Sequence, residues 1–227
     1  MKARLAAIQK RINAAAHGCQ RDPESVRLVA VSKTIPADVV RQAIEAGADI
    51  LGENYVQEAR DKFNLLHPYD VAWHFIGHLQ SNKAKHAVRI FDLIHSVDSL
   101  KLAREIDKQA RKVDKSQSIL IQVNVAQEGT KSGISPSEAP ALIANAAQFD
   151  HVAIKGLMTM PPFFNNPEKV RPYFATLREL SQEIEALNIP NVSMNELSMG
   201  MTGDFEAAIE EGATFVRVGT AIFGERY

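Results

Sequence analysis

The chain has 227 residues, of which 45% are hydrophobic and 23% charged, and its formal net charge is -1. This composition is typical of a soluble globular protein, and the balanced charge gives no reason to expect a nucleic acid or a membrane as partner. A single cysteine, Cys19, excludes a disulfide framework, and no apolar run approaches the roughly 20 residues that span a membrane. Charges interrupt the first ten residues too often for a secretory signal, so we expect a cytoplasmic protein.

Strand-like and helix-like segments alternate along the chain after a first amphipathic helix. Residues 1–18 are predicted to form that helix because Leu5, Ile8 and Ile12 recur at helical spacing. Short apolar runs bounded by turn residues predict eight strands, at 27–33, 49–54, 72–77, 93–97, 118–125, 152–158, 195–198 and 214–219. The helices predicted between them include 36–47, a basic stretch ending at 89, one with Leu100, Ala103, Ile106 and Ala110 on one face, 136–149, 168–187 and 204–211.

Eight strands, each followed by a helical stretch, predict a single (β/α)8 TIM barrel domain over residues 1–227. An open, doubly wound sheet is the alternative, because alternation alone does not distinguish the two. The proline-rich segment 161–167 is the nearest candidate for a linker, but alternation resumes after it, so we interpret it as a loop of the same domain.

The apolar run that begins at Leu28 ends at Lys33, which is therefore expected at the carboxyl edge of a buried strand. Ligands bind at that edge in parallel α/β proteins. Val29 and Val31 lie on the same face as this lysine, and a partly desolvated amine is a better nucleophile toward carbonyls. We therefore expect Lys33 to form a Schiff base. A strand-end lysine with its ammonium group in solvent is the alternative.

Two loops near the C-terminus combine glycines with hydroxyl groups, at 198–204 and 219–222. In TIM barrels a phosphate commonly binds between the loops after the seventh and eighth strands. Glycine lets backbone N–H groups approach an anion, and the helix expected from Asp204 directs its positive end toward the first loop. Together the two loops predict a phosphate site, whereas each alone would be read as an ordinary turn.

Arg217 shares a strand face with Gly219, so it is expected to point toward the same ligand from deeper in the barrel. A buried charge needs a partner, which a ligand ring nitrogen or carboxylate would supply. The alternative is an internal ion pair with Glu53 or Glu196. His74 and His78 are four residues apart but straddle a strand end, so we expect no metal site.

Several motifs occur in an order and spacing that resemble one known family over nearly the whole chain. They are VSKT (31–34), GENYVQE (52–58), WHFIG (73–77), LQ (79–80), NK (82–83), QVN (122–124), KSG (131–133), GLM (156–158), SMGM (198–201) and VRVGTAIFG (216–224). This set closely resembles the YggS/PROSC family of pyridoxal phosphate homeostasis proteins. That family is similar to the barrel of alanine racemase without the second, β domain.

The resemblance implies a barrel that carries pyridoxal 5′-phosphate (PLP) as a Schiff base on Lys33. It places the phosphate on Ser198, Gly219 and Thr220 with neighbouring backbone such as that of Gly200, Arg217 beside the pyridine nitrogen, and Asn54 near the cofactor. The chain departs from the common pattern at Ile35, where many members have a second lysine, and at Thr202, where many have serine.

Three functions are compatible with an activated lysine and a phosphate site. The resemblance favours a non-catalytic PLP carrier in vitamin B6 homeostasis, monomeric, with PLP-dependent apoenzymes as recipients. A PLP-dependent amino-acid racemase or decarboxylase is the first alternative. It is disfavoured because an arginine beside the ring weakens the electron sink and no β domain follows Gly219 to supply a second base. A cofactor-free aldolase acting on a sugar phosphate is the second alternative.

Overall fold

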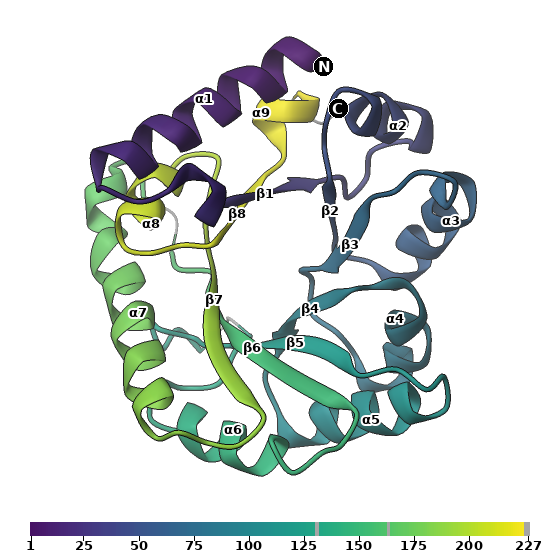
Figure 1. The fold of residues 1–227 in the computed structure, drawn as a ribbon, viewed down its shortest axis with the longest axis vertical. Coiled ribbons are helices and arrows are strands. Elements are labelled where there is room, and N and C mark those ends of the chain that lie inside the picture. Colours follow the sequence, from purple (N-terminus) through teal and green to yellow (C-terminus); the bar gives the residue numbers. More distant parts are fainter. Residues whose placement is uncertain (130–131, 163, 225–227) are drawn as a thin grey trace.

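In the computed structural model, which describes residues 1–129, 132–162 and 164–224, eight parallel strands close into a barrel. They follow one another in chain order, and β1 (Arg27–Val31) pairs with β8 (Phe215–Val218) to complete the ring (Figure 1). This closure confirms the predicted (β/α)8 barrel and excludes the open sheet. The other strands are β2 (Ile50–Glu53), β3 (Ala72–Phe75), β4 (Leu93–Val97), β5 (Gln117–Gln122), β6 (Val152–Met158) and β7 (Val192–Met201).

Helices surround the barrel on the outside (Figure 1). Among the described residues none of them is long and apolar enough to cross a bilayer. They are α1 (Lys2–Gly18), α2 (Ala37–Glu45), α3 (Val56–Leu66), α4 (Ala84–Ile90), α5 (Leu100–Arg111), α6 (Ala139–Ala146), α7 (Arg171–Ala186), α8 (Phe205–Glu210) and α9 (Thr220–Phe223), with short 3₁₀ turns η1 (Pro23–Ser25), η2 (Ser81–Lys83) and η3 (Pro167–Lys169).

Two apolar clusters form the core, as expected where alternate side chains of each strand face opposite sides of the sheet. The larger cluster fills the layer between the strands and the helices, and α1 adds Leu5, Ile8 and Ile12 to it. The smaller cluster consists of strand residues that lie inside the barrel. Its members are Val29, Ile50, Leu93, Leu120, Met158 and Phe215.

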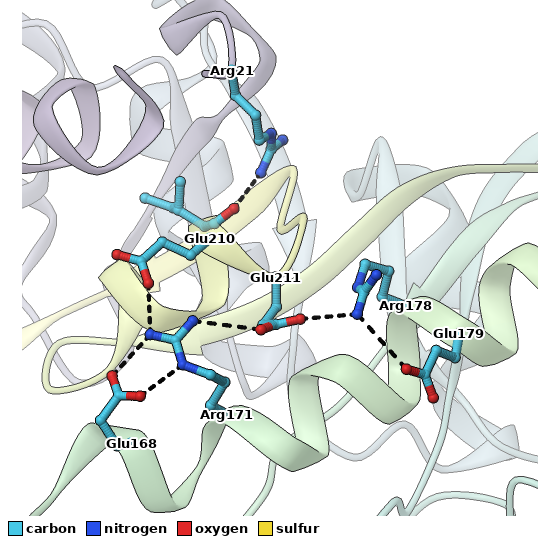
Figure 2. Close-up of polar contacts among 8 residues, drawn as sticks. Arg21, Glu168, Arg171, Arg178, Glu179, Glu210 and Glu211 are labelled. Atoms are coloured by element: carbon cyan, nitrogen blue, oxygen red, sulfur yellow. Dashed lines mark hydrogen bonds and ion pairs between the residues drawn. The ribbon is translucent and has the colours of Figure 1, made fainter. Parts of the chain in front are cut away.

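A ladder of ion pairs joins α7 to α8 on the outside of the barrel (Figure 2). Arg171 donates to both carboxylate oxygens of Glu168 at 2.8 Å and also contacts Glu210 and Glu211 at 2.6 and 3.4 Å. Arg178 continues the ladder to Glu211 at 3.1 Å. These partly exposed pairs each contribute little, but together they form a network that links α7 to α8.

Candidate functional site

Lys33 lies in the turn that follows β1, at the carboxyl end of the barrel. β1 ends at Val31, and the N–H of Ile35 donates to the carbonyl of the buried Ser32 at 3.0 Å, so the chain turns sharply here. Thr34 adopts a left-handed backbone with φ of 63°, which costs a non-glycine residue about 1–2 kcal/mol. Contacts elsewhere must hold this turn, because its own backbone does not favour it.

A buried lysine, Lys62 of α3, holds the turn in place through hydrogen bonds and ion pairs. Its ammonium group donates to the carbonyl of Ser32 at 2.5 Å and to the carboxylates of Glu53 and Glu58, both at 2.7 Å. Glu58 in turn accepts the N–H of Thr34 at 2.5 Å, and Glu53 accepts the hydroxyl of Ser32 at 2.7 Å. Burial raises the pKa of Glu53, and Lys62 and Ser32 oppose that rise.

The side chain of Lys33 lines a cavity of about 480 Å³ in the barrel mouth, a volume typical of small-molecule sites. The cavity brings together five of the seven predicted site residues: Lys33, Asn54, Arg217, Gly219 and Thr220. Its remaining walls are formed by Val31, Ile76, Met160, Met201 and Thr202.

Arg217 lies at the cavity wall with its guanidinium buried inside the barrel; only 4% of the residue is exposed. It donates to the hydroxyl of Ser198 at 2.6 Å and to the carbonyl of Thr159 at 2.8 Å. No carboxylate among the described residues lies within ion-pair distance of it. The alternative of an ion pair with Glu53 or Glu196 is therefore wrong, because Glu53 binds Lys62 and Glu196 binds Arg27.

Burial lowers the pKa of Arg217 to about 10, and the field of Asp204 opposes that change. The guanidinium therefore stays charged at neutral pH. It has five N–H donors, of which described residues accept two, so the group can also donate into the cavity.

Ser198 does not line the cavity. Its side chain is fully buried inside the barrel, where its hydroxyl contacts Arg217 and lies 2.8 Å from Nδ1 of His95. The strand pairing is irregular between Ser198 and Met201, and β7 runs on to Met201. That extension places Met201 and Thr202, rather than Ser198, at the cavity wall.

The loops after β7 and β8 meet at the cavity, as a TIM-barrel phosphate site requires. The hydroxyls of Thr220 and Thr202 lie 3.5 Å apart, one from each loop. Gly219 precedes α9; its carbonyl accepts the N–H groups of Ile222 and Phe223 at 2.9 Å, whereas the N–H groups of Thr220 and Ala221 have no acceptor within the helix. The first loop is fixed by Asp204, whose carboxylate accepts the N–H of Met201 at 2.6 Å.

Gly200 contributes through its backbone rather than through the cavity wall. Its φ is 88°, and a Cβ at this position would lie 2.6 Å from the Cβ of Ala208 and 3.0 Å from the Cα of Phe205. Only glycine combines that conformation with such close packing on α8. Gly200 therefore lets the β7 loop pack closely on α8, and Thr202 of the same loop lines the cavity.

Asn54, at the end of β2, has a buried carboxamide oxygen with no hydrogen-bond partner among the described residues. Gly77 packs directly on its backbone, since a Cβ there would lie 2.3 Å from the carbonyl oxygen of Asn54. An unpaired buried acceptor beside a cavity is costly, so a donor from a ligand would stabilise it.

Sequence reasoning missed part of the cavity wall. Ile76 follows β3, and Met160 follows β6, where neither periodicity nor motif spacing indicates which side chains turn inward. Thr202, by contrast, belongs to the predicted phosphate loop 198–204 and does line the cavity. The described residues contain no cluster of metal-ligating side chains, and His74 contacts His95 rather than His78.

Comparisons with known proteins agree with this geometry. The family model for the N-terminal domain of alanine racemase matches residues 3–227. A pyridoxal phosphate homeostasis protein of Aquifex aeolicus is 46% identical, with 98% of this chain and 97% of the relative covered. The structure of PipY from Synechococcus elongatus without PLP has a TM-score of 0.88 at 39% identity, covering 99% of this chain and all of PipY. The structure of PipY with PLP bound has a TM-score of 0.86 at 38% identity, covering 98% and 99%. The chain therefore belongs to the alanine racemase N-terminal domain family, alongside the relatives named pyridoxal phosphate homeostasis proteins.

Proposed function

We propose that this chain binds PLP, carries it as a Schiff base on Lys33, and serves intracellular PLP homeostasis. PLP supplies an aldehyde that condenses with an amine. The proposal is supported by relatives that carry this name, by a PipY structure with PLP bound, and by a cavity that combines a lysine, a guanidinium and two hydroxyl-bearing loops.

The burial of Arg217 beside the cavity is the strongest support for the proposal. Arg217 is a buried cation with no described carboxylate within ion-pair distance, and it borders the cavity. An arginine cannot act as an acceptor, so it suits a ring nitrogen that presents a lone pair. This residue therefore favours a pyridine ring as ligand.

We assign the phosphate to the part of the cavity between the β7 and β8 loops. Gly219 and Thr220 supply backbone N–H groups and a hydroxyl, and Thr202 supplies a second hydroxyl. Direct contact between Ser198 and the phosphate remains a prediction; the geometry favours a supporting role in which Ser198 holds Arg217. In this proposal Asn54 accepts a hydrogen bond from the ligand or from Lys33.

The geometry favours a carrier over a racemase or decarboxylase. Racemisation needs a second acid–base group on the opposite face of the cofactor. Among the described residues that line the cavity, Lys33 and Arg217 are the titratable ones. The guanidinium of Arg217 can only donate hydrogen bonds, so it cannot serve as a base. Tyr55, which could have served as a base, is 60% exposed and is not part of this wall. An arginine beside the ring also weakens it as an electron sink.

We further propose that the protein acts as a cytoplasmic monomer and passes PLP to apoenzymes that depend on it. Incubation of the loaded protein with a PLP-dependent apoenzyme tests the transfer. Activity should appear faster than with the same concentration of free PLP in the presence of a scavenger. Light scattering of the loaded protein tests the monomer.

Absorbance titration with PLP tests the proposed function itself. The wild type should turn yellow at a stoichiometry of one, and borohydride should bleach the colour. Lys33→Ala should lose the colour while Lys83→Ala, on the exterior of the barrel mouth, keeps it.

To separate carrier from enzyme, the loaded protein is incubated with single amino acids in deuterated water. Rapid α-deuterium incorporation that Lys33→Ala abolishes would replace the carrier by an enzyme.

A further inference from the structure

Four polar side chains form a continuous chain of hydrogen bonds across the inside of the barrel. It starts at Arg217 of β8, whose guanidinium donates to the hydroxyl of Ser198 of β7 at 2.6 Å. From there the chain crosses to β4, where Nδ1 of His95 lies 2.8 Å from that hydroxyl. It ends on β3, with Nε2 of His95 3.0 Å from Nδ1 of His74. The β3–β4 and β7–β8 pairs are not neighbours in the ring, so the chain spans its interior (Figure 1).

The chain is buried along its whole length. Ser198 and His95 are fully buried, and His74 is 5% exposed. Both imidazole rings contact the ring of Phe215, at 5.2 and 5.5 Å between centroids. Neither histidine has an acidic partner within ion-pair distance among the described residues. Four polar groups in an apolar core must therefore satisfy one another.

Donor and acceptor chemistry gives this chain one direction. The guanidinium can only donate, so the hydroxyl oxygen of Ser198 accepts from Arg217. The serine proton then needs an acceptor, and His95 Nδ1 is the one within reach among the described residues. That leaves the proton of His95 on Nε2, from which it is donated to Nδ1 of His74. Each histidine consequently carries its proton on Nε2.

Both rings must be neutral for this arrangement to hold. Burial lowers the pKa of His74 to about 3, with a smaller effect from Arg27. Burial also lowers the pKa of His95 well below its ordinary value, with smaller effects from His74, Arg217 and Arg27. The electrostatics therefore agree with the geometry of the contacts.

We propose that His95 and His74 are positioning residues for the ligand ring, acting through Ser198 and Arg217. The directed chain holds the guanidinium so that its remaining donors face the cavity and present a fixed hydrogen-bond donor to a ring acceptor. The proposal rests on the proposed function, because the ring acceptor is the pyridine nitrogen of PLP. If the histidines merely filled space, their replacement would affect every ligand of the cavity equally.

The first test needs no cofactor. In the cofactor-free protein, ¹⁵N NMR of the imidazole rings should show His95 and His74 neutral and protonated on Nε2 at pH 7. A proton on Nδ1 of His95, or a charged ring, would overturn the directed chain even if the protein binds PLP.

The second test compares two ligands that differ in the ring acceptor, PLP and its 1-deaza analogue, in which a C–H replaces the pyridine nitrogen. His95→Leu removes the acceptor of Ser198, whereas His95→Asn keeps an oxygen near the position of Nδ1. Ser198→Ala breaks the chain next to Arg217 without changing either histidine. Circular dichroism establishes that each variant is folded.

His95→Leu and Ser198→Ala should each weaken PLP binding by at least about tenfold, the lower end of the effect of one hydrogen bond to a charged group. His95→Asn should bind PLP more nearly like the wild type, and all three variants should bind the deaza analogue as the wild type does. Equal losses for both ligands would refute the positioning role. Failure of wild-type protein to bind either ligand would refute the proposed function instead, and the NMR measurement would still decide the direction of the chain.

Discussion

Replacing Lys62 with methionine removes the charge at the centre of the network that holds the Lys33 turn. Methionine keeps the length of the apolar stem, so the change isolates the ammonium group. The side chain of Lys62 is 7% exposed and that of Glu53 is fully buried. After the change, Glu53 keeps a single donor, the hydroxyl of Ser32, and one of its oxygens already has no partner among the described residues.

Removing one partner of a buried ion pair costs about 3–5 kcal/mol, because the remaining charge stays buried without compensation. We expect a loss in this range for Lys62→Met. The surface pair of Lys108 and Glu105, 3.6 Å apart with Lys108 62% exposed, provides the control. Lys108→Met should cost at most about 1 kcal/mol.

Urea unfolding followed by fluorescence of Trp73 gives the measurement. This is the single tryptophan of the chain, and it packs edge-on against Phe63 of α3, the helix that carries Lys62. A second variant, Glu53→Gln combined with Lys62→Met, removes the charge left behind and should recover part of the loss. A loss for Lys62→Met no larger than that of Lys108→Met would refute the reasoning.

The penalty in Lys62→Met should also depend on pH. Burial raises the pKa of Glu53, and without Lys62 a main opposing influence is gone. A carboxyl whose pKa is raised in the folded state favours folding below its unfolded pKa and loses that contribution as pH rises through the folded value. The variant should therefore be closest to the wild type in mild acid and furthest from it above neutral pH.

Three further predictions concern the barrel interior, the mouth and the phosphate loops. The pKa of His74 is lowered to about 3, so the stability it contributes is complete above 6.5 and is lost as pH falls toward 3, by about 1.4 kcal/mol per pH unit. Because the pKa of His95 is lowered as well, the wild type should lose stability between pH 7 and 5 through both histidines, and His74→Gln should reduce that loss in urea unfolding; an equal loss in His74→Gln would contradict the prediction. Gly77→Ala should destabilise by about 1–3 kcal/mol, because its Cβ would clash with Asn54, whereas Gly129→Ala, with open space around it, should not; equal melting temperatures would refute the clash. Thr202→Val combined with Thr220→Val should weaken PLP binding more than either change alone, and unchanged affinity in equilibrium dialysis would place the phosphate elsewhere.

The sequence predicted the barrel and the position of β1 because both depend on local patterns. Alternation of strands and helices determines the topology, and the β-branched run before Lys33 marks a buried strand. The predicted strand nevertheless extended to Lys33, whereas β1 ends at Val31. The difference arises from Lys62 and Glu58, which hold Thr34 in a left-handed conformation. The contact between Lys62 and Ser32 joins residues that are 30 apart in the sequence, so no local sequence pattern indicates it.

The same limit explains the differences at the phosphate loops. Strand alternation placed Arg217 on the correct face of β8. Its partner could not be predicted, because Glu53, one of the two expected partners, pairs with Lys62 instead. The strand predicted at 195–198 is β7, Val192–Met201, and its irregular pairing moves Thr202 into the cavity. The helix α9 is only four residues long, too short to show a helical period.

Mass spectrometry of the protein after loading with PLP and reduction with borohydride tests the central claim most directly. Reduction makes the linkage to the amine permanent, so a proteolytic digest identifies the residue that carries the ligand. The account predicts one phosphopyridoxyl group per chain, on the peptide that contains Lys33, and none in Lys33→Ala. A stoichiometric adduct on another lysine of the wild type, such as Lys83, or the absence of any adduct, would contradict it.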